Sequence, residues 1–204
     1  MMRKYRFTIL SSMITWIAVG AWAGSLWAGT PMEQVKVTAD RVMEILKDPK
    51  LQGDVNKKER RERLRQAIVP RFDFAEMAKR SLGSQWNRNP EKQQEFVAAF
   101  TQLLEDSYAD QIEAANSDKI VYGSERRDQN FAEVNTKVIS PKGQETSINY
   151  KLQLSGDEWK VYDVVVENIS LVNNYRSQFQ RVLNTVSLDE LIRRMKEKKF
   201  EKSS

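Results

Sequence analysis

The chain has 204 residues, and its 33 Lys and Arg against 28 Asp and Glu give a formal net charge of +5. It contains no Cys and no His, which excludes disulfides, a cysteine nucleophile, a Ser-His relay and a His-ligated zinc site. The sequence also has no glycine-rich phosphate loop and no G-x-S-x-G elbow, which argues against an enzyme.

The first residues form the pattern of an export signal. Three Lys or Arg lie within the first six positions, an uncharged apolar run follows, and an A-x-A cleavage motif ends at Ala23. We therefore expect residues 1–23 to be a cleavable secretory signal peptide and residues 24–204 to form a single domain. Cleavage after Ala28 and an uncleaved membrane anchor are the alternatives. Removal of the signal lowers the net charge from +5 to +2, so we expect no nucleic-acid partner.

Two helices are expected directly after the signal. Thr30 and Glu33 form a capping box at the start of the first helix, and the dipeptide Asp48-Pro49 ends it. A second, highly charged helix opens at Asn56. Its acidic and basic residues are interleaved, which is typical of a solvated helix face and not of a surface for anions.

Two further helices carry wide apolar stripes. Asp73 and Glu76 form another capping box, and Gly83 fits the left-handed residue that ends this helix. A long helix then opens at Asn89-Pro90. The apolar residues that we expect to point inward from this part of the chain are Phe72, Phe74, Met77, Trp86, Phe96, Phe100, Leu103, Leu104 and Tyr108.

From residue 119 the apolar period changes to two, which predicts strands. Short turns join them, which makes the sheet antiparallel, and they are expected at 119–124, 131–140, 145–155 and 158–167. In the third strand Ile148, Tyr150 and Leu152 alternate with polar residues, which predicts one covered and one wet face. Two helices, one over 171–186 and one capped by Ser187, finish the chain.

The last strand raises a question, because both of its faces are partly apolar. Strict alternation places Trp159 and Val161 on one face and Val164 and Val166 on the other. The helix that follows adds an apolar stripe of its own, formed by Leu171, Val172, Tyr175 and Phe179. We therefore expect an α+β domain, with a curved antiparallel sheet of about four strands covered on one side by helices. Composition alone leaves open whether the apolar residues form a solid core or surround a cavity.

Three segments resemble the MlaC family, also called the toluene-tolerance or ABC transporter auxiliary component family. They are VVVENISLVNNYRSQF, FDFAEMAKRSLGSQW and QEFVAAFTQLLEDSY, and in order they span nearly the whole mature chain. The chain departs from the family pattern at Asn168, where Gly is usual. Asn is the next-best residue for a left-handed backbone, so we expect a positive φ there.

The resemblance implies a periplasmic phospholipid carrier, with acyl chains in an apolar cavity between sheet and helices. The implied partners are an outer-membrane lipoprotein–porin complex and an inner-membrane ABC transporter complex with its substrate-binding component, which together maintain outer-membrane lipid asymmetry. The resemblance implies no catalytic residue, no metal and no cofactor other than phospholipid as cargo. The expected cavity residues are Phe72, Phe74, Met77, Trp86, Phe96, Phe100, Leu103, Leu104, Tyr108, Ile148, Tyr150, Leu152, Val164, Val166, Leu171, Val172, Tyr175 and Phe179.

Three alternative functions stay open at this point. The cargo would be another lipid such as a hopanoid, or the chain would be a lipid-free periplasmic binding or adaptor module with a solid core. An enzyme would have to use Asp73, Asp163 and Glu167 for acid–base chemistry, with Arg176 as an anion clamp, although helix capping already explains Asp73. Headgroup and acyl-chain preference, direction of transport, oligomeric state and the docking surfaces do not follow from the sequence.

Overall fold

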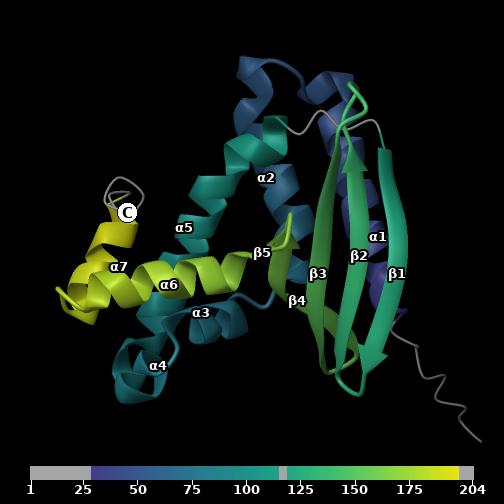
Figure 1. Cartoon of the computed structure of the whole chain (residues 1–204). Helices are drawn as coiled ribbons and strands as arrows, with labels where there is room; N and C mark the ends of the chain where they lie inside the picture. The colour runs from purple at the N-terminus through teal and green to yellow at the C-terminus, as the bar shows by residue number, and fades with distance from the viewer. Residues whose placement is uncertain (1–28, 115–118, 198–204) are drawn as a thin grey trace, which may run out of the picture.

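The computed structural model describes residues 29–114 and 119–197, so the expected signal peptide lies outside the described residues. A curved antiparallel sheet stands beside a group of helices (Figure 1), which confirms the expected fold class. The helices are α1 (Pro31–Lys47), α2 (Lys57–Ile68), α3 (Phe74–Leu82), α4 (Gln85–Arg88), α5 (Gln93–Ala114), α6 (Leu171–Leu183) and α7 (Leu188–Lys196). The strands are β1 (Lys119–Asp128), β2 (Phe131–Ile139), β3 (Glu145–Ser155), β4 (Glu158–Val166) and β5 (Ile169–Ser170). Within the described ranges no helix is both long and apolar enough to cross a membrane.

Capping side chains begin the helices largely as the sequence predicts. At α1 the Thr30 hydroxyl accepts the Glu33 N–H at 3.1 Å, and the Glu33 carboxylate accepts the Thr30 N–H at 2.6 Å. At α7 the Ser187 hydroxyl accepts the Glu190 N–H at 3.3 Å. Asn56, before α2, makes no side-chain capping bond. Local hydrogen bonds therefore place the helix starts at both ends of the domain.

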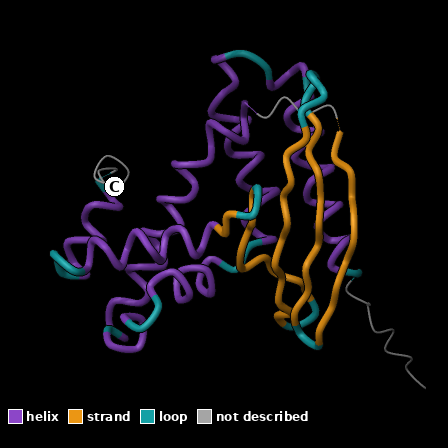
Figure 2. The backbone as a smooth tube through the Cα atoms, in the orientation of Figure 1, coloured by secondary structure: helices purple, strands orange, loops and turns teal. Residues whose placement is uncertain are grey.

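The sheet is a meander in the order β1-β2-β3-β4-β5, as Figure 2 shows along the backbone. The first strand is longer than the sequence indicated, because it continues past residue 124 to Asp128. Its register with β2 shifts between Tyr122 and Glu125, where β1 has one residue more than β2. The bulge lets β1 stay paired with β2 beyond the point where its apolar alternation is interrupted. In the sequence, this interruption looks like the end of the strand.

A second bulge answers the question raised by the last strand. Leu152 of β3 pairs with Val161, but Tyr150, two residues earlier, pairs with Val164, so β4 has one extra residue between them. An extra residue reverses the alternation for everything after it. Trp159, Val161 and Val164 therefore share the covered face, and the expectation from strict alternation that they lie on opposite faces is wrong.

The buried apolar side chains form three separate clusters. The first lies among α3, α5, α6 and α7, where Phe96, Phe100 and Phe179 are fully buried with ring centroids 5.5 to 6.0 Å apart. The second lies between α1 and the sheet around Val134, and the third joins α1 and α2 around Leu64. A domain of this size usually has one contiguous core. The space that separates the clusters therefore needs an explanation.

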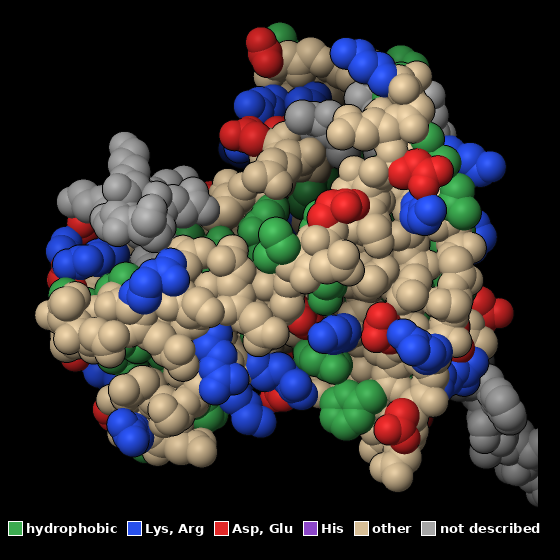
Figure 3. All heavy atoms as spheres, viewed as in Figure 1, with side chains coloured by type: hydrophobic (Ala, Val, Ile, Leu, Met, Phe, Trp, Pro, Cys, Tyr) green, Lys and Arg blue, Asp and Glu red, His purple; other side chains and the backbone are tan. Residues whose placement is uncertain are grey.

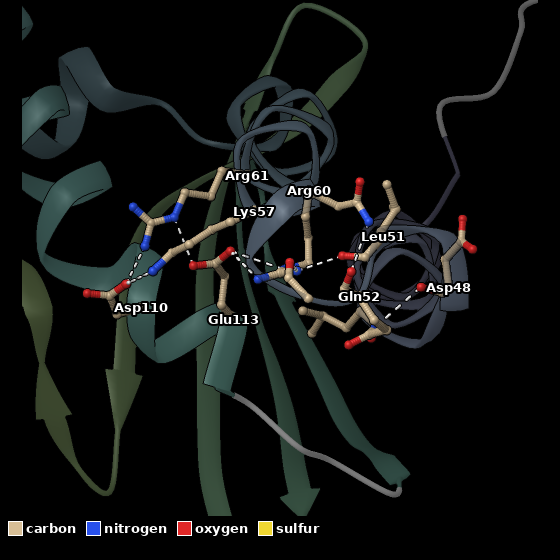
Figure 4. A network of polar contacts seen from close by, with 11 residues as sticks. Asp48, Leu51, Gln52, Lys57, Arg60, Arg61, Asp110 and Glu113 are labelled. Atoms are coloured by element: carbon tan, nitrogen blue, oxygen red, sulfur yellow. Dashed lines mark hydrogen bonds and ion pairs between the residues drawn. The ribbon is translucent and has the colours of Figure 1, made fainter.

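Ion pairs join α2 to α5 (Figure 4). The Glu113 carboxylate, whose side chain is 8% exposed, accepts hydrogen bonds from Arg60 at 3.1 Å and from Arg61 at 2.8 Å. Arg60 also donates to the carbonyl oxygen of Leu51 at 2.6 Å. Asp110, which is 78% exposed, pairs with Arg61 near the surface. Part of the charge on α2 is thus used between helices, where the sequence indicated a solvated face.

A two-residue turn joins β4 to β5. Glu167 has φ 47° and Asn168 has φ 67°, which confirms the expected positive φ at Asn168. Two consecutive left-handed residues in a two-residue hairpin loop are the requirement of a type I′ turn. The Asp163 carboxylate then accepts a hydrogen bond from the Ser170 hydroxyl at 2.7 Å, and that hydroxyl accepts the Asn173 N–H at 3.1 Å. These contacts hold the corner from which α6 begins.

Substitution at Asn168 tests this turn. Asn168→Gly is expected to leave the free energy of unfolding unchanged or slightly higher, because glycine adopts positive φ without strain. Asn168→Val is expected to lower it by about 1 kcal/mol or more, because a β-branched residue is strained there. Urea unfolding of both variants measures the difference. Equal stability of the two variants would contradict the left-handed geometry.

The α2–α5 contact predicts an unequal response from its two carboxylates. Glu113→Gln is expected to lower the free energy of unfolding by about 2 kcal/mol, because it leaves the Arg60 guanidinium, whose side chain is 13% exposed, without an anion. Asp110→Asn is the matched control and is expected to change it by less than about 0.5 kcal/mol, as is usual for exposed pairs. Urea unfolding measures both variants. Similar losses of unfolding free energy would show that the different burial of Glu113 and Asp110 does not decide how much each contributes.

Candidate functional site

The space between the three clusters is a cavity of about 1450 Å³. Its lining comes from the covered face of the sheet, from α1, α2 and α5, and from the chain around the starts of α3 and α6. Figure 3 shows hydrophobic side chains in the region between α5 and the sheet. Typical small-molecule pockets hold roughly 300–1,000 Å³. The cavity is therefore large enough for a long apolar ligand.

Ten of the eighteen expected cavity residues line this space. They are Phe72, Phe74, Met77, Leu104, Tyr108, Ile148, Tyr150, Val164, Val166 and Leu171. They come from every part of the chain that the sequence singled out, and the fold brings them together around one volume.

The structure places the other eight elsewhere. Leu152 lies in the cluster between α1 and the sheet, Trp86 packs at the edge of the helical cluster, and the rest belong to that cluster, namely Phe96, Phe100, Leu103, Val172, Tyr175 and Phe179. The reason is that α5 and α6 each present apolar side chains in more than one direction. Successive helical residues point about 100° apart, so a wide apolar stripe can serve two neighbours at once. One side of the α5 stripe packs against α6 and α7, while Leu104 and Tyr108 face the cavity.

Sequence reasoning did not assign the contribution of α1, α2 and the outer strands to the cavity. The apolar lining residues it left out are Val35, Ala39, Val42, Met43, Leu46, Leu64, Ile68, Val69, Ala109, Ile112, Ile120, Val138, Val161 and Ile169. The apolar stripe of α1 was a usable signal, since its helical spacing is clear in the sequence. Nothing local in that stripe says whether it faces protein or ligand.

Charged side chains border the cavity on α2 and α5. Lys57, Lys58 and Arg61 belong to the lining, as does Arg65, which donates to Glu105 at 3.0 Å. The lining therefore combines a long apolar surface with a charged border. An amphiphile, with an apolar chain and a polar end, matches this division.

Two polar residues among the apolar lining are held by protein partners. The Arg71 guanidinium donates to the carbonyl oxygen of Trp159 at 2.8 Å and to the Thr38 hydroxyl at 3.3 Å, which ties β4 to α1. Burial lowers the pKa of Arg71. Burial also raises the pKa of the Tyr150 phenol, so this group stays neutral at physiological pH. Neither residue presents a nucleophile or a base to the cavity.

The carboxylates considered for acid–base chemistry each accept structural hydrogen bonds. Asp73 accepts the Glu76 N–H and the Gln153 amide, each at 2.9 Å, at the start of α3. Asp163 holds the start of α6, and Glu167 accepts the backbone N–H of Ser147 within the β4–β5 turn region. In the described part of the chain no group of three or more acidic side chains is placed to hold a metal ion.

Comparison with known proteins gives consistent matches. A family model described as MlaC protein matches residues 36–197. The intermembrane phospholipid transport system binding protein MlaC of Haemophilus influenzae is 26% identical over 202 residues, which cover 95% of this chain and 92% of that protein. The toluene tolerance protein ttg2D of Pseudomonas putida is 28% identical over 170 residues, which cover 81% of this chain and 79% of that protein.

A solved structure has the same fold. It is the phospholipid-binding protein from Ralstonia solanacearum in complex with a phospholipid, and it superposes with a TM-score of 0.75 at 26% sequence identity. The match covers 86% of this chain and 100% of that chain. Likeness over this length includes the sheet and the helices that enclose the cavity.

Val164 tests whether the cavity holds a soft occupant. Val164→Trp is expected to give a folded protein with a melting temperature near that of the wild type but little bound lipid, because the indole takes up cavity volume. Val134, which is fully buried in the cluster between α1 and the sheet, is the matched control. Val134→Trp overpacks solid protein and is expected to cost about 1–3 kcal/mol.

The experiment measures melting temperature and extracted lipid on the same preparation of each variant. A Val164→Trp protein that melts much earlier and keeps its lipid would place Val164 in packed protein.

Proposed function

Because the chain belongs to the MlaC family, whose model matches residues 36–197, we propose that it is a phospholipid carrier that shields acyl chains in the cavity between its sheet and its helices. The observation that carries this proposal is the apolar volume of about 1450 Å³ between clusters that are each packed on their own. The similar Ralstonia protein was solved with a phospholipid, which supports the assignment of the ligand class.

We assign the acyl-chain contacts to the apolar side chains that line the cavity. From the expected set these are Phe72, Phe74, Met77, Leu104, Tyr108, Ile148, Tyr150, Val164, Val166 and Leu171. The stripe of α1, from Val35 to Leu46, faces them across the cavity. The expected residues outside the lining would act indirectly, by packing the helices that carry the walls.

The energetics of such a carrier limit what it can do alone. Burying one methylene group from water gains about 0.8 kcal/mol, so two acyl chains represent on the order of tens of kcal/mol. A bilayer buries the same chains equally well, so the free-energy change of moving a lipid between membrane and carrier is close to zero. Direction must therefore come from the partners and not from the cavity.

The place of work and the partners follow from the same proposal. The N-terminal export pattern supports release into the periplasm after cleavage of residues 1–23. The Haemophilus relative is named as the binding protein of an intermembrane phospholipid transport system. We infer that this chain exchanges lipid with an outer-membrane lipoprotein–porin complex and with an inner-membrane ABC transporter complex, and so maintains outer-membrane lipid asymmetry.

Lipid analysis tests the carrier function directly. The protein, expressed with its own N-terminus and purified without detergent, is expected to release phospholipid in near-stoichiometric amount on organic extraction, as measured by mass spectrometry. Ala39→Trp, on the cavity side of α1, is expected to reduce the amount of lipid. Val37→Trp is the control on the same helix, because Val37 is 68% exposed and does not line the cavity.

Protein that folds but carries no lipid would overturn the proposal in favour of an adaptor module. A hopanoid in place of phospholipid would keep the carrier and change its cargo.

A further inference from the structure

A second, smaller hollow lies on the opposite face of β4 from the cavity. It has a volume of about 340 Å³, and α3, α6 and the outer face of the sheet form its walls. The bulge in β4 separates the two hollows, because Tyr162 and Asp163 border the small one while Val161 and Val164 line the cavity. The two hollows share no lining residue. Whatever the small pocket binds is therefore separate from the cargo.

Four cationic side chains surround this pocket, which is named here the α3–α6 pocket. They are Lys79, Arg80, Lys151 and Arg176. Figure 3 shows Lys and Arg side chains gathered in the region where α3 and α6 meet the sheet. Glu76, beside the pocket, pairs with Lys79 at 3.1 Å and with Arg80 at 2.8 Å, while Lys151 lies only within 4.0 Å of Asp163. The side chain of Arg176 makes no hydrogen bond or ion pair with any residue in the described ranges.

The pocket has a surplus of hydrogen-bond donors. The indole N–H of Trp86 and the hydroxyl of Tyr162 have no acceptor among the described residues. Burial raises the pKa of Tyr162, so its hydroxyl keeps its proton. The one carboxylate in the lining, Asp163, is already used by the Ser170 hydroxyl at 2.7 Å and by the Val172 N–H at 3.1 Å. A ligand for this pocket must therefore bring its own acceptors.

Two contacts give the pocket a fixed shape. The Arg80 guanidinium lies over the Tyr162 ring at 4.1 Å from the centroid, which holds both side chains in place. Gly83, at the end of α3, has φ 63°, and a Cβ atom there would lie 3.3 Å from the Arg176 Nε. The absence of a side chain at Gly83 thus lets the guanidinium lie close to the backbone of α3.

We propose that the α3–α6 pocket binds a phosphate group, with Arg176 as its principal ligand. The donors come from α3, α4, α6 and the strands β3 and β4, so they surround the pocket on several sides. A tetrahedral phosphate can accept hydrogen bonds from several directions at once, while a planar carboxylate accepts mainly within its own plane. Arginine suits this ligand because its fork donates to two oxygens of the same group. The phosphate belongs either to the headgroup of a lipid in a membrane or to a soluble phosphate ester.

Phosphate titration followed by NMR tests the proposal. The indole N–H signal of Trp86, assigned with Trp86→Phe, is expected to shift saturably with inorganic phosphate at an ionic strength held constant with sodium chloride. Arg176→Gln is expected to weaken binding at least tenfold. Arg181→Gln is the matched control, because Arg181 is an exposed cation of the same helix that lines neither hollow, and it is expected to bind as the wild type does.

Further arms separate the two sources of phosphate. Glycerol 3-phosphate represents a soluble ester, and vesicles of phosphatidylcholine with phosphatidylglycerol, assayed by flotation, represent a membrane. If Arg176→Gln abolishes vesicle binding and Arg181→Gln does not, the phosphate is that of a lipid headgroup in a membrane. If the protein responds to the soluble probes alone, the phosphate is that of a soluble ester. Both results are expected to persist in Val164→Trp, so failure of the carrier function does not affect them.

Two results would overturn the proposal. One is the lack of any saturable response of the wild type to all three probes. The other is equal weakening by Arg176→Gln and Arg181→Gln, which would reduce the effect to general charge attraction. If Arg176→Gln does not fold, as judged by circular dichroism, Lys151→Gln replaces it, and it is expected to weaken binding by a smaller factor while Arg181→Gln still binds as the wild type does.

Discussion

The fold depends on keeping three hydrophobic clusters apart. Each cluster closes on its own, through the aromatic rings of Phe96, Phe100 and Phe179 among the helices, through α1 on the sheet, and through α1 on α2. If the three clusters packed against one another, protein side chains would occupy the cavity. At the α2–α5 contact, ion pairs of Arg60 and Arg61 with Glu113 supply much of what joins the two helices, and Ile112 adds an apolar contact from α5 to the α1–α2 cluster.

Because of its bulge, the single strand β4 lines two different hollows. Before and after the bulge, Val161 and Val164 face the cavity, while Tyr162 and Asp163 face the α3–α6 pocket. A regular strand of the same sequence would turn Val164 outward and leave the cavity floor incomplete. The irregularity therefore allows an apolar hollow and a cationic hollow to lie back to back on a single strand.

Local chemistry made much of the fold predictable from the sequence. The capping box at Thr30, the end of α3 at Gly83 and the turn at Asn168 depend on residues only a few positions apart, and all three are as expected. The bulges in β1 and β4 depend on pairing with a neighbouring strand, so alternation within one strand misplaces Trp159 relative to Val164.

The candidate site was harder to predict, because a cavity forms where side chains of different elements do not pack against one another. An apolar stripe has the same appearance whether it faces protein or an acyl chain. Phe100 and Tyr108 belong to the same stripe of α5, yet one is sealed in the helical cluster and the other lines the cavity. Only the placement of α6 and α7 against one side of α5 separates them.

The separation of the clusters also affects how the protein responds to compression. Unfolding under hydrostatic pressure is driven by the elimination of internal void volume. A cavity of about 1450 Å³ that is filled by acyl chains contributes little void, whereas the same cavity without cargo contributes a large one unless the walls close. The loaded carrier should therefore withstand pressures that unfold the empty one, and the difference between them reports how far the walls relax after the lipid has left.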